Sequence, residues 1–181
     1  MAESIIEEHL FIEAIMKDMT PKDATVPGAS VQLTYYEGFQ RTIFYTTIET
    51  PFPEGKLIVS RTDTFGIITH CNKSFCDIAG YTKEELIGEY HSILRHPDMP
   101  AVAFKGLWDT IQQGKRWHGY VKNLRKDGGF YWVFATVIPN VREGNIIGYT
   151  SVRRKPSRTK VDECVVLYKK LLEDEKKIKN S

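Results

Sequence analysis

Two hairpin signals near the end of the chain limit its possible folds more than any other feature. They are Lys126-Asp127-Gly128-Gly129 and Arg142-Glu143-Gly144-Asn145, and Asp-Gly and Gly-Asn pairs favour the tight turns that join antiparallel strands. We expect Pro139 to end the middle strand, because proline cannot donate to a sheet ladder. The flanking segments are rich in β-branched and aromatic residues. They predict a meander of three strands over 117–124, 130–138 and 146–152.

The residues before this meander predict a further hairpin followed by short helices. Leu57–Thr62 and Ile67–Cys71 have strand composition, and a turn that ends in Gly66 separates them. Thr82 and Glu85 have capping-box spacing. Helices are expected over 73–79, 82–88 and 101–113. Together these elements predict an α+β fold, with a five-stranded antiparallel sheet and short helices on one face.

The two ends of the chain are expected to flank this central domain. Residues 4–19 have a broad apolar helical face, residues 20–31 have the composition of a linker, and residues 32–50 lean toward strand. Pro156 separates a C-terminal helix in which apolar residues recur from Val161 to Ile178. That helix either docks on its own sheet or binds a partner, and the pattern favours neither. The expected segments are 1–52 (N-terminal helix and cap), 53–155 (sensor domain) and 156–181 (C-terminal helix).

Composition excludes several classes of protein. The formal net charge is only +2, which indicates neither a nucleic-acid partner nor an acidic membrane partner. The three cysteines have no metal-binding spacing and suggest a reducing compartment. No apolar run is long enough to span a bilayer, and the acidic N-terminus is unlike a signal peptide. We therefore expect a cytoplasmic protein without direct membrane insertion.

One polar turn stands out between two expected helices. Arg95, His96 and Asp98 occupy three of four consecutive positions, and Pro97 and Pro100 make the backbone there rigid. The turn either caps a helix through a local Arg–Asp pair or holds a ligand, because positioned polar groups on loops often form binding sites. The spacing alone leaves both interpretations open.

Five sequence blocks add a family resemblance. They are Thr69–Asn72, Gly80–Gly88, Arg95–Pro100, Trp117–Asn123 and Phe130–Val133. Block after block, they resemble the PAS domain of the bacterial aerotaxis receptor family of energy-taxis proteins, over roughly residues 57–153. The Gly80–Gly88 block is generic to PAS domains, whereas the Arg95–Pro100 block followed by Trp117 and Asn123 is specific to that family.

The resemblance implies a PAS fold and a redox sensor that binds FAD without covalent attachment. In that family the chain continues into membrane-spanning helices and a methyl-accepting signalling domain, whereas this sequence ends at Ser181 without either. We therefore expect a stand-alone sensor that signals to a separate transmembrane methyl-accepting chemoreceptor. A homodimer through the helix over 4–19 and the sheet is also expected, with the helix from Val161 to Ile178 offered to the receptor.

The resemblance also assigns candidate cofactor residues. Trp117 could lie against the flavin ring or be an ordinary core residue, and Asn72 could bind a ring edge or simply cap a helix. Asn123 offers a second amide, and when a flavin ring nitrogen gains a proton this amide would have to rotate or lose its bond. Arg95 suits a phosphate or ribose, and His96 and Asp98 could hold the ribose or each other.

Two other functions remain open from the sequence. A haem-binding gas sensor would need an axial ligand such as His70, His91, His96 or His118. A cofactor-free interaction module would use the polar turn only as structure. The sequence contains no nucleophile–base pair, metal motif or phosphate loop of the kind that indicates an enzyme, so we do not expect an enzyme. Blue-light adduct chemistry would need a cysteine near the ring, and residues 89–113 contain none.

Overall fold

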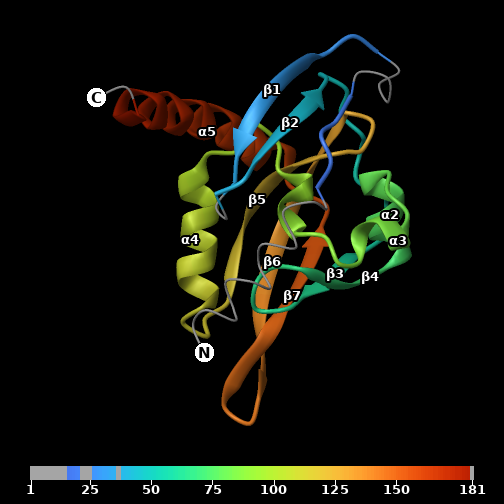
Figure 1. Cartoon of the computed structure of the whole chain (residues 1–181), viewed down its shortest axis with the longest axis vertical. Coiled ribbons are helices and arrows are strands. Elements are labelled where there is room, and N and C mark those ends of the chain that lie inside the picture. The colour runs from blue at the N-terminus through green and yellow to red at the C-terminus, as the bar shows by residue number, and fades with distance from the viewer. Residues whose placement is uncertain (1–15, 21–25, 36–37, 180–181) are drawn as a thin grey trace.

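The computed structural model describes residues 16–20, 26–35 and 38–179 (Figure 1). Its main sheet has five antiparallel strands in the order β4-β3-β7-β6-β5, which confirms the expected fold class. The central pairings join the first hairpin to the end of the meander through β3 and β7. The strands are β3 (Ile58–Thr62), β4 (Ile68–Cys71), β5 (Trp117–Leu124), β6 (Phe130–Arg142) and β7 (Asn145–Arg154).

Short helices cover one face of this sheet, with α2 and α3 near the β4 edge and α4 near the β5 edge (Figure 1). Local caps explain where they begin and end. Thr82 and Glu85 form the expected capping box, and Gly80 ends α2 at a φ of 78°, a conformation that favours glycine. The elements are α2 (Lys73–Ala79), α3 (Lys83–Leu86), the 3-10 helix η3 (His91–Leu94) and α4 (Ala101–Ile111).

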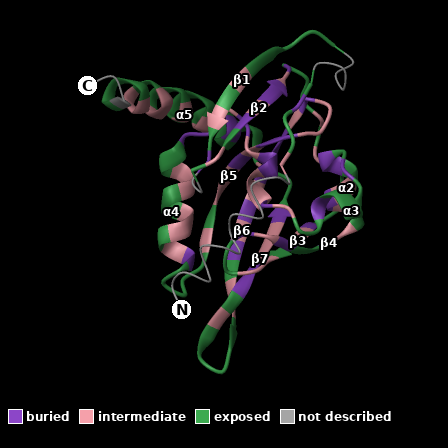
Figure 2. Cartoon of the chain, viewed as in Figure 1, coloured by how far each residue is buried: buried purple, intermediate pink, exposed green. Residues whose placement is uncertain are grey.

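The main core lies between this helical layer and the inner face of the sheet. Phe75, Leu86, Leu94, Tyr131 and Val133 are almost fully buried in it. Figure 2 shows buried residues along the middle of the sheet, whereas the tip of the β6–β7 hairpin is exposed. Odd-numbered residues of β5 and β6 point inward and even-numbered ones outward, as the alternation of a strand requires.

The expectation that Pro139 ends the middle strand is wrong. β6 continues to Arg142, and Pro139 pairs with Tyr149 of β7. The reason is tertiary. β5 pairs with β6 only as far as Val137, so beyond that residue β6 has one open edge where a missing N–H costs little.

The strand-rich segment that the sequence left unplaced forms a hairpin of β1 (Ala29–Thr34) and β2 (Gln40–Tyr45). The linker expected over 20–31 is therefore too long, because β1 already begins at Ala29. Buried Arg41 joins this hairpin to the domain by donating to the carbonyls of Lys17 and Ile93. The helix expected over 4–19 lies mostly outside the described residues, and its last residues, 16–19, are not helical.

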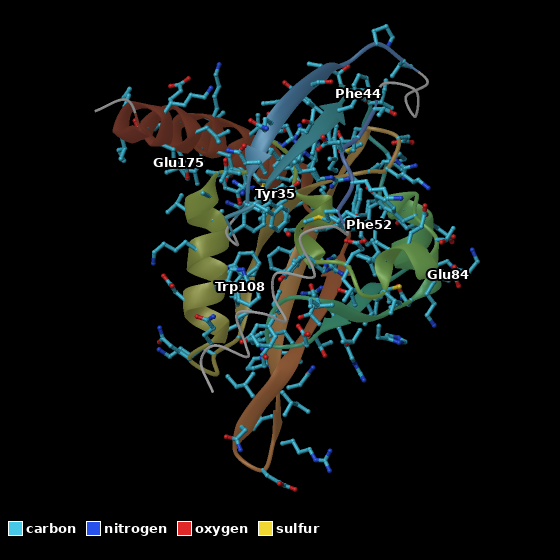
Figure 3. All side chains as sticks on the ribbon, viewed as in Figure 1. Tyr35, Phe44, Phe52, Glu84, Trp108 and Glu175 are labelled. Carbon is cyan, nitrogen blue, oxygen red and sulfur yellow. The ribbon has the colours of Figure 1, made fainter. Side chains whose placement is uncertain are left out.

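The C-terminal helix α5 (Arg158–Lys179) docks on the outer face of its own sheet. Tyr168 Oη donates to the Tyr120 carbonyl at 2.7 Å, and the Tyr168 ring stacks on Trp132 at 6.2 Å between ring centres. Near its end, Glu175 Oε1 accepts from the Val102 backbone N–H at 3.0 Å, at the N-terminus of α4. Pro100, the N-cap of α4, has no side chain that can accept a hydrogen bond from the first turn. Glu175 supplies that acceptor from α5 (Figure 3). No helix among the described residues is long and apolar enough to span a membrane.

Candidate functional site

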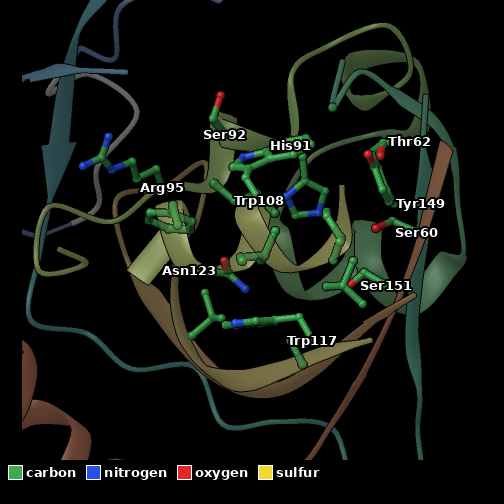
Figure 4. Close-up of a pocket in the computed structure, with 18 of the residues that line it drawn as sticks. Ser60, Thr62, His91, Ser92, Arg95, Trp108, Trp117, Asn123, Tyr149 and Ser151 are labelled. Atoms are coloured by element: carbon green, nitrogen blue, oxygen red, sulfur yellow. The ribbon is translucent and has the colours of Figure 1, made fainter. Parts of the chain in front are cut away.

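A cavity of about 340 Å³ lies between the inner face of the sheet and the helical layer (Figure 4). Strands β5, β6 and β7 form one wall, α4 and η3 form the opposite wall, and Thr34 and Tyr35 reach its rim from the β1 side. A volume of this size falls in the range of small-molecule sites. The lining is mostly apolar with a few polar side chains, the usual composition of a small-molecule or cofactor site.

Two tryptophans supply flat apolar surface. Trp108 of α4 packs edge-on against Tyr149 with ring centres 5.6 Å apart. The ring of Trp117 lies over Gly119, where an added Cβ would come within 2.7 Å of it. Glycine at 119 therefore lets the Trp117 ring lie along β5 at the cavity wall, available for stacking against a ligand.

Asn123 presents an amide to the cavity from β5, and only 5% of its surface is exposed. Its Nδ2 makes no hydrogen bond of normal geometry among the described residues, although the Tyr131 side chain lies close enough to interact with it. A buried donor without an acceptor costs about 1–3 kcal/mol, so this amide is suited to bind a polar ring edge. Figure 4 shows it between Arg95 and Trp117.

The most unusual group in the wall is Arg153 of β7, which is 3% exposed. Its Nη2 donates to Ser60 Oγ at 3.0 Å and lies 2.5 Å from His91 Nε2, while its Nη1 has no partner. The guanidinium carbon also lies 5.0 Å from the centre of the Phe75 ring. Among the described residues no carboxylate pairs with Arg153, so the wall carries a buried cation without a counter-charge.

Burial and the missing counter-charge determine protonation in this wall. Burial lowers the pKa of Arg153 to about 10, so the guanidinium is charged at neutral pH. Burial, and then the nearby Arg153 charge, lower the pKa of His91 to about 3. His91 is therefore neutral, and its Nε2 accepts from Arg153. An unpaired cation in a low-dielectric wall favours an electron-rich or anionic ligand group opposite it.

Three of the six expected cofactor residues line the cavity, namely Arg95, Trp117 and Asn123. Arg95 lies at the rim, where its Nη1 donates to the Thr34 carbonyl at 3.0 Å and its guanidinium lies over the rings of Tyr35 and Phe104. Sequence reasoning missed Arg153 and Trp108, and it considered His91 only as a haem ligand. Alternation along β7 was the signal that could have revealed Arg153, because it places Arg153 on the same face as Tyr149 and Ser151.

The other three expected residues, Asn72, His96 and Asp98, lie outside the cavity lining. Asp98 is exposed and pairs with Lys122 at 2.7 Å. His96 is buried between the rings of Tyr45 and Phe130, and its Nδ1 accepts from the Asp98 N–H. These contacts hold the turn that leads into α4, so the geometry gives these two residues a positioning role.

Asn72 joins two elements of the fold. Its Oδ1 accepts from the N–H groups of Val59 and Phe75, and its Nδ2 donates to the Leu57 carbonyl. Asn72→Ala removes the cap of α2 and its link to β3, so we expect a loss of about 1–3 kcal/mol in the free energy of unfolding by urea titration. Asn145→Ala, which removes a bond in an exposed turn, should change it by less than about 0.5 kcal/mol. Equal losses in the two variants would contradict the capping role.

His96 predicts a dependence of stability on pH. Burial, and then the Lys122 charge, lower its pKa to about 3, below the value of an unfolded chain. Between these two values the unfolded state binds more protons, so stability is complete above about pH 6.5 and falls as the pH falls toward 3. The slope of unfolding free energy against pH, measured between pH 5 and 7, should become shallower in His96→Gln. His70→Gln, at an exposed position, is the matched control for the substitution itself.

The histidines named as possible haem ligands are dispersed. Of His70, His91, His96 and His118, only His91 lines the cavity, and its Nε2 is engaged by Arg153. None of Cys71, Cys76 and Cys164 lines it either. The geometry therefore favours noncovalent binding of a flat ligand with a polar, electron-rich edge.

Comparison with known proteins gives the class. Residues 68–153 match the family described as the PAS fold, so the chain contains a PAS domain. The resemblance to the aerotaxis-receptor type of PAS domain is confirmed, because the chain is 43% identical over 128 residues to the aerotaxis receptor of Escherichia coli K12. That match covers 71% of this chain and 25% of the receptor.

Solved structures agree on the fold. The dark structure of the blue-light photoreceptor Aureochrome1 LOV gives a TM-score of 0.53 at 25% identity, covering 67% of this chain and 86% of that chain. A light-oxygen-voltage domain studied with a flavin analogue gives 0.51 at 22% identity, with the same coverage of 67% and 86%.

Proposed function

We propose that this protein is a redox or energy sensor that binds FAD in the cavity and signals to a separate transmembrane chemoreceptor. The observation that carries this proposal is that two buried donors, Asn123 Nδ2 and Arg153 Nη1, face a mostly apolar cavity without a hydrogen bond of normal geometry among the described residues. The similarity to an aerotaxis receptor supports the sensing role. The related light-oxygen-voltage fold, studied with a flavin analogue, supports a flavin as the ligand class.

The residues present fit a flavin. Trp117 offers a stacking surface, Asn123 offers an amide for the polar ring edge, and Arg153 offers positive charge to an electron-rich edge. A bound flavin would supply reversible uptake of electrons. The cavity is at the small end of the range for ligand sites, so a dinucleotide would extend past the rim. Arg95 lies at that rim with donors suited to phosphate.

We infer that α4 and α5 carry the signal outward. α4 forms one wall of the cavity together with η3, and Glu175 of α5 caps the N-terminus of α4. A change in the ligand that moves α4 therefore alters a contact of α5. The outward-facing apolar residues Val165, Val166 and Leu167 of α5 then offer a surface to the receptor. Removal of residues 158–181 should abolish co-purification with the receptor while the flavin is retained.

The contact between α5 and α4 can be tested alone. Glu175→Ala leaves the Val102 N–H without its partner, and we expect the end of α5 to lose protection from amide hydrogen exchange by about threefold to tenfold. Glu173→Ala, at an exposed position of the same helix, is the matched control. Equal exchange rates in the two variants would show that the Glu175 contact does not couple α5 to α4. The proposed homodimer through residues 4–19 stays a prediction, because those residues lie mostly outside the described part.

The cofactor proposal is tested on protein purified from cells grown with ample riboflavin. The protein should show flavin absorption bands, and chromatography of the heat-released cofactor should identify FAD. If the released cofactor is FMN, the proposal of a flavin site stands, but the proposal that the ligand is the dinucleotide FAD is wrong. A Soret band would favour haem, and a well-folded protein without any chromophore after reconstitution would favour the cofactor-free module.

A further inference from the structure

A pair of thiols lies outside the cavity, at the start of α2. The Sγ atoms of Cys71 and Cys76 are 3.7 Å apart. Cys71 is the last residue of β4 and is 3% exposed, whereas Cys76 on α2 is half-buried. These positions flank the N-cap Asn72 and are the ones that a hydrophobic staple normally fills. A staple made of two thiols packs like any small apolar pair but can also be oxidised.

We propose that Cys71 and Cys76 form a reversible intramolecular disulfide when the protein meets a hydroperoxide. The sulfurs are already in contact, and the local backbone is fixed by the bonds that Asn72 makes to Val59, Phe75 and Leu57. To form a bond of about 2.05 Å, the two sulfurs must approach each other from their present separation of 3.7 Å. Cys164 lies on α5 and is the reference thiol.

The burial of the two thiols sets the order of steps. Burial, and then the hydrogen bond with Cys76, raise the pKa of Cys71 to about 11, so Cys71 stays protonated at neutral pH. The more exposed Cys76 thiol attacks the hydroperoxide and breaks the O–O bond. Its sulfur takes up the hydroxyl group and becomes a sulfenic acid, and the thiol proton leaves with the departing oxygen as an alcohol or water. The Cys71 thiol then attacks the sulfenic sulfur. The S–S bond forms, the S–O bond breaks, and the Cys71 proton leaves with the hydroxyl group as water.

The pair is connected to the cavity through the residue next to Cys76. Phe75 packs against His91, with ring centres 5.8 Å apart, and against the Arg153 guanidinium at 5.0 Å. A disulfide would fix the start of α2 to β4. Phe75, which precedes Cys76 in the sequence, packs against Arg153 and His91 of the cavity wall, so the disulfide would constrain a neighbour of that wall. The disulfide itself does not depend on a bound flavin, so its test is separate from that of the proposed function.

The test uses the reduced full-length protein, hydrogen peroxide as the oxidant, and alkylation followed by trypsin digestion. Cleavage after Arg61, Lys73 and Lys83 separates the two cysteines into peptides 62–73 and 74–83. We expect these two peptides to be joined by a disulfide that dithiothreitol reverses. Alkylation of Cys71 and Cys76 should fall at least about tenfold, while alkylation of Cys164 falls less than about twofold.

Two variants provide the controls. Cys164→Ser should give the same joined peptides, and Cys76→Ser should give none and leave Cys71 open to alkylation after denaturation. Peptides that stay separate while Cys76 is oxidised to sulfinic acid would overturn the proposal. A disulfide that instead joins Cys164 to another chain, with the first pair still reduced, would also overturn it.

Discussion

Replacing Arg153 by methionine should weaken FAD binding by about tenfold to a hundredfold while leaving the ligand-free protein equally stable or more stable. The two effects have one cause. Arg153 is a buried cation without a carboxylate partner, and its Nη1 is unsatisfied. Removing such a charge relieves a desolvation cost in the empty protein. It also removes a charge-assisted contact from the bound state, worth about 1.5–3 kcal/mol.

A purely structural arginine would behave in the opposite way. Arg125 pairs with Asp127 and donates to the Ile78 carbonyl, so Arg125→Met is the matched control. We expect that variant to be destabilised by about 1–3 kcal/mol, with an unchanged FAD affinity in the folded fraction. Isothermal titration and urea unfolding measure both quantities. Loss of stability in Arg153→Met without loss of affinity would show that Arg153 is structural.

The second large effect concerns Trp117. Trp117→Ala removes the stacking surface on the β5 wall, and loss of aromatic stacking costs about 1–3 kcal/mol, or roughly tenfold to a hundredfold in affinity. Gly119→Ala keeps the tryptophan but displaces its ring, because the new Cβ would lie 2.7 Å from ring atoms. We therefore expect Gly119→Ala alone to weaken FAD binding at least about tenfold.

A double-mutant cycle distinguishes this mechanism from general damage to β5. In the Trp117→Ala background there is no ring to displace, so adding Gly119→Ala should change the affinity less than about twofold. Additive losses in the double variant would mean that the glycine matters for the strand rather than for the position of the ring. Gly106→Ala is a control, because nothing lies within 4 Å of an added Cβ there.

Most elements of the fold could be predicted because their signals are local. Gly80 and the Thr82–Glu85 capping box set helix ends within a few residues, and the Asp127-Gly128 turn fixes the register of β5 on β6. Pro139 was misjudged because its tolerance depends on an open sheet edge that no local pattern records. The β1–β2 hairpin was not placed because its contacts to the domain are long-range.

The site was predicted only in part, and for a physical reason. Asn123 and Trp117 were named from the family resemblance, and the structure places both on the inward-facing side of β5, where they line the cavity. Arg153 is followed by Arg154 and Lys155, and in sequence it resembles a solvated basic end. Its burial results from the placement of β7 in the middle of the sheet. Asn72, His96 and Asp98 were grouped with the cofactor site by resemblance, and their contacts lie outside the cavity lining. The segment boundaries at 52 and 155 remain predictions.

An equilibrium titration of FAD into the ligand-free protein tests the central claim most directly. Absorption near the blue should gain fine structure as the ring enters the apolar cavity, and the change should saturate at one flavin for each chain. Arg153→Met and Gly119→Ala should each shift the midpoint to higher FAD concentration. Absence of saturable binding to a folded protein would contradict the account.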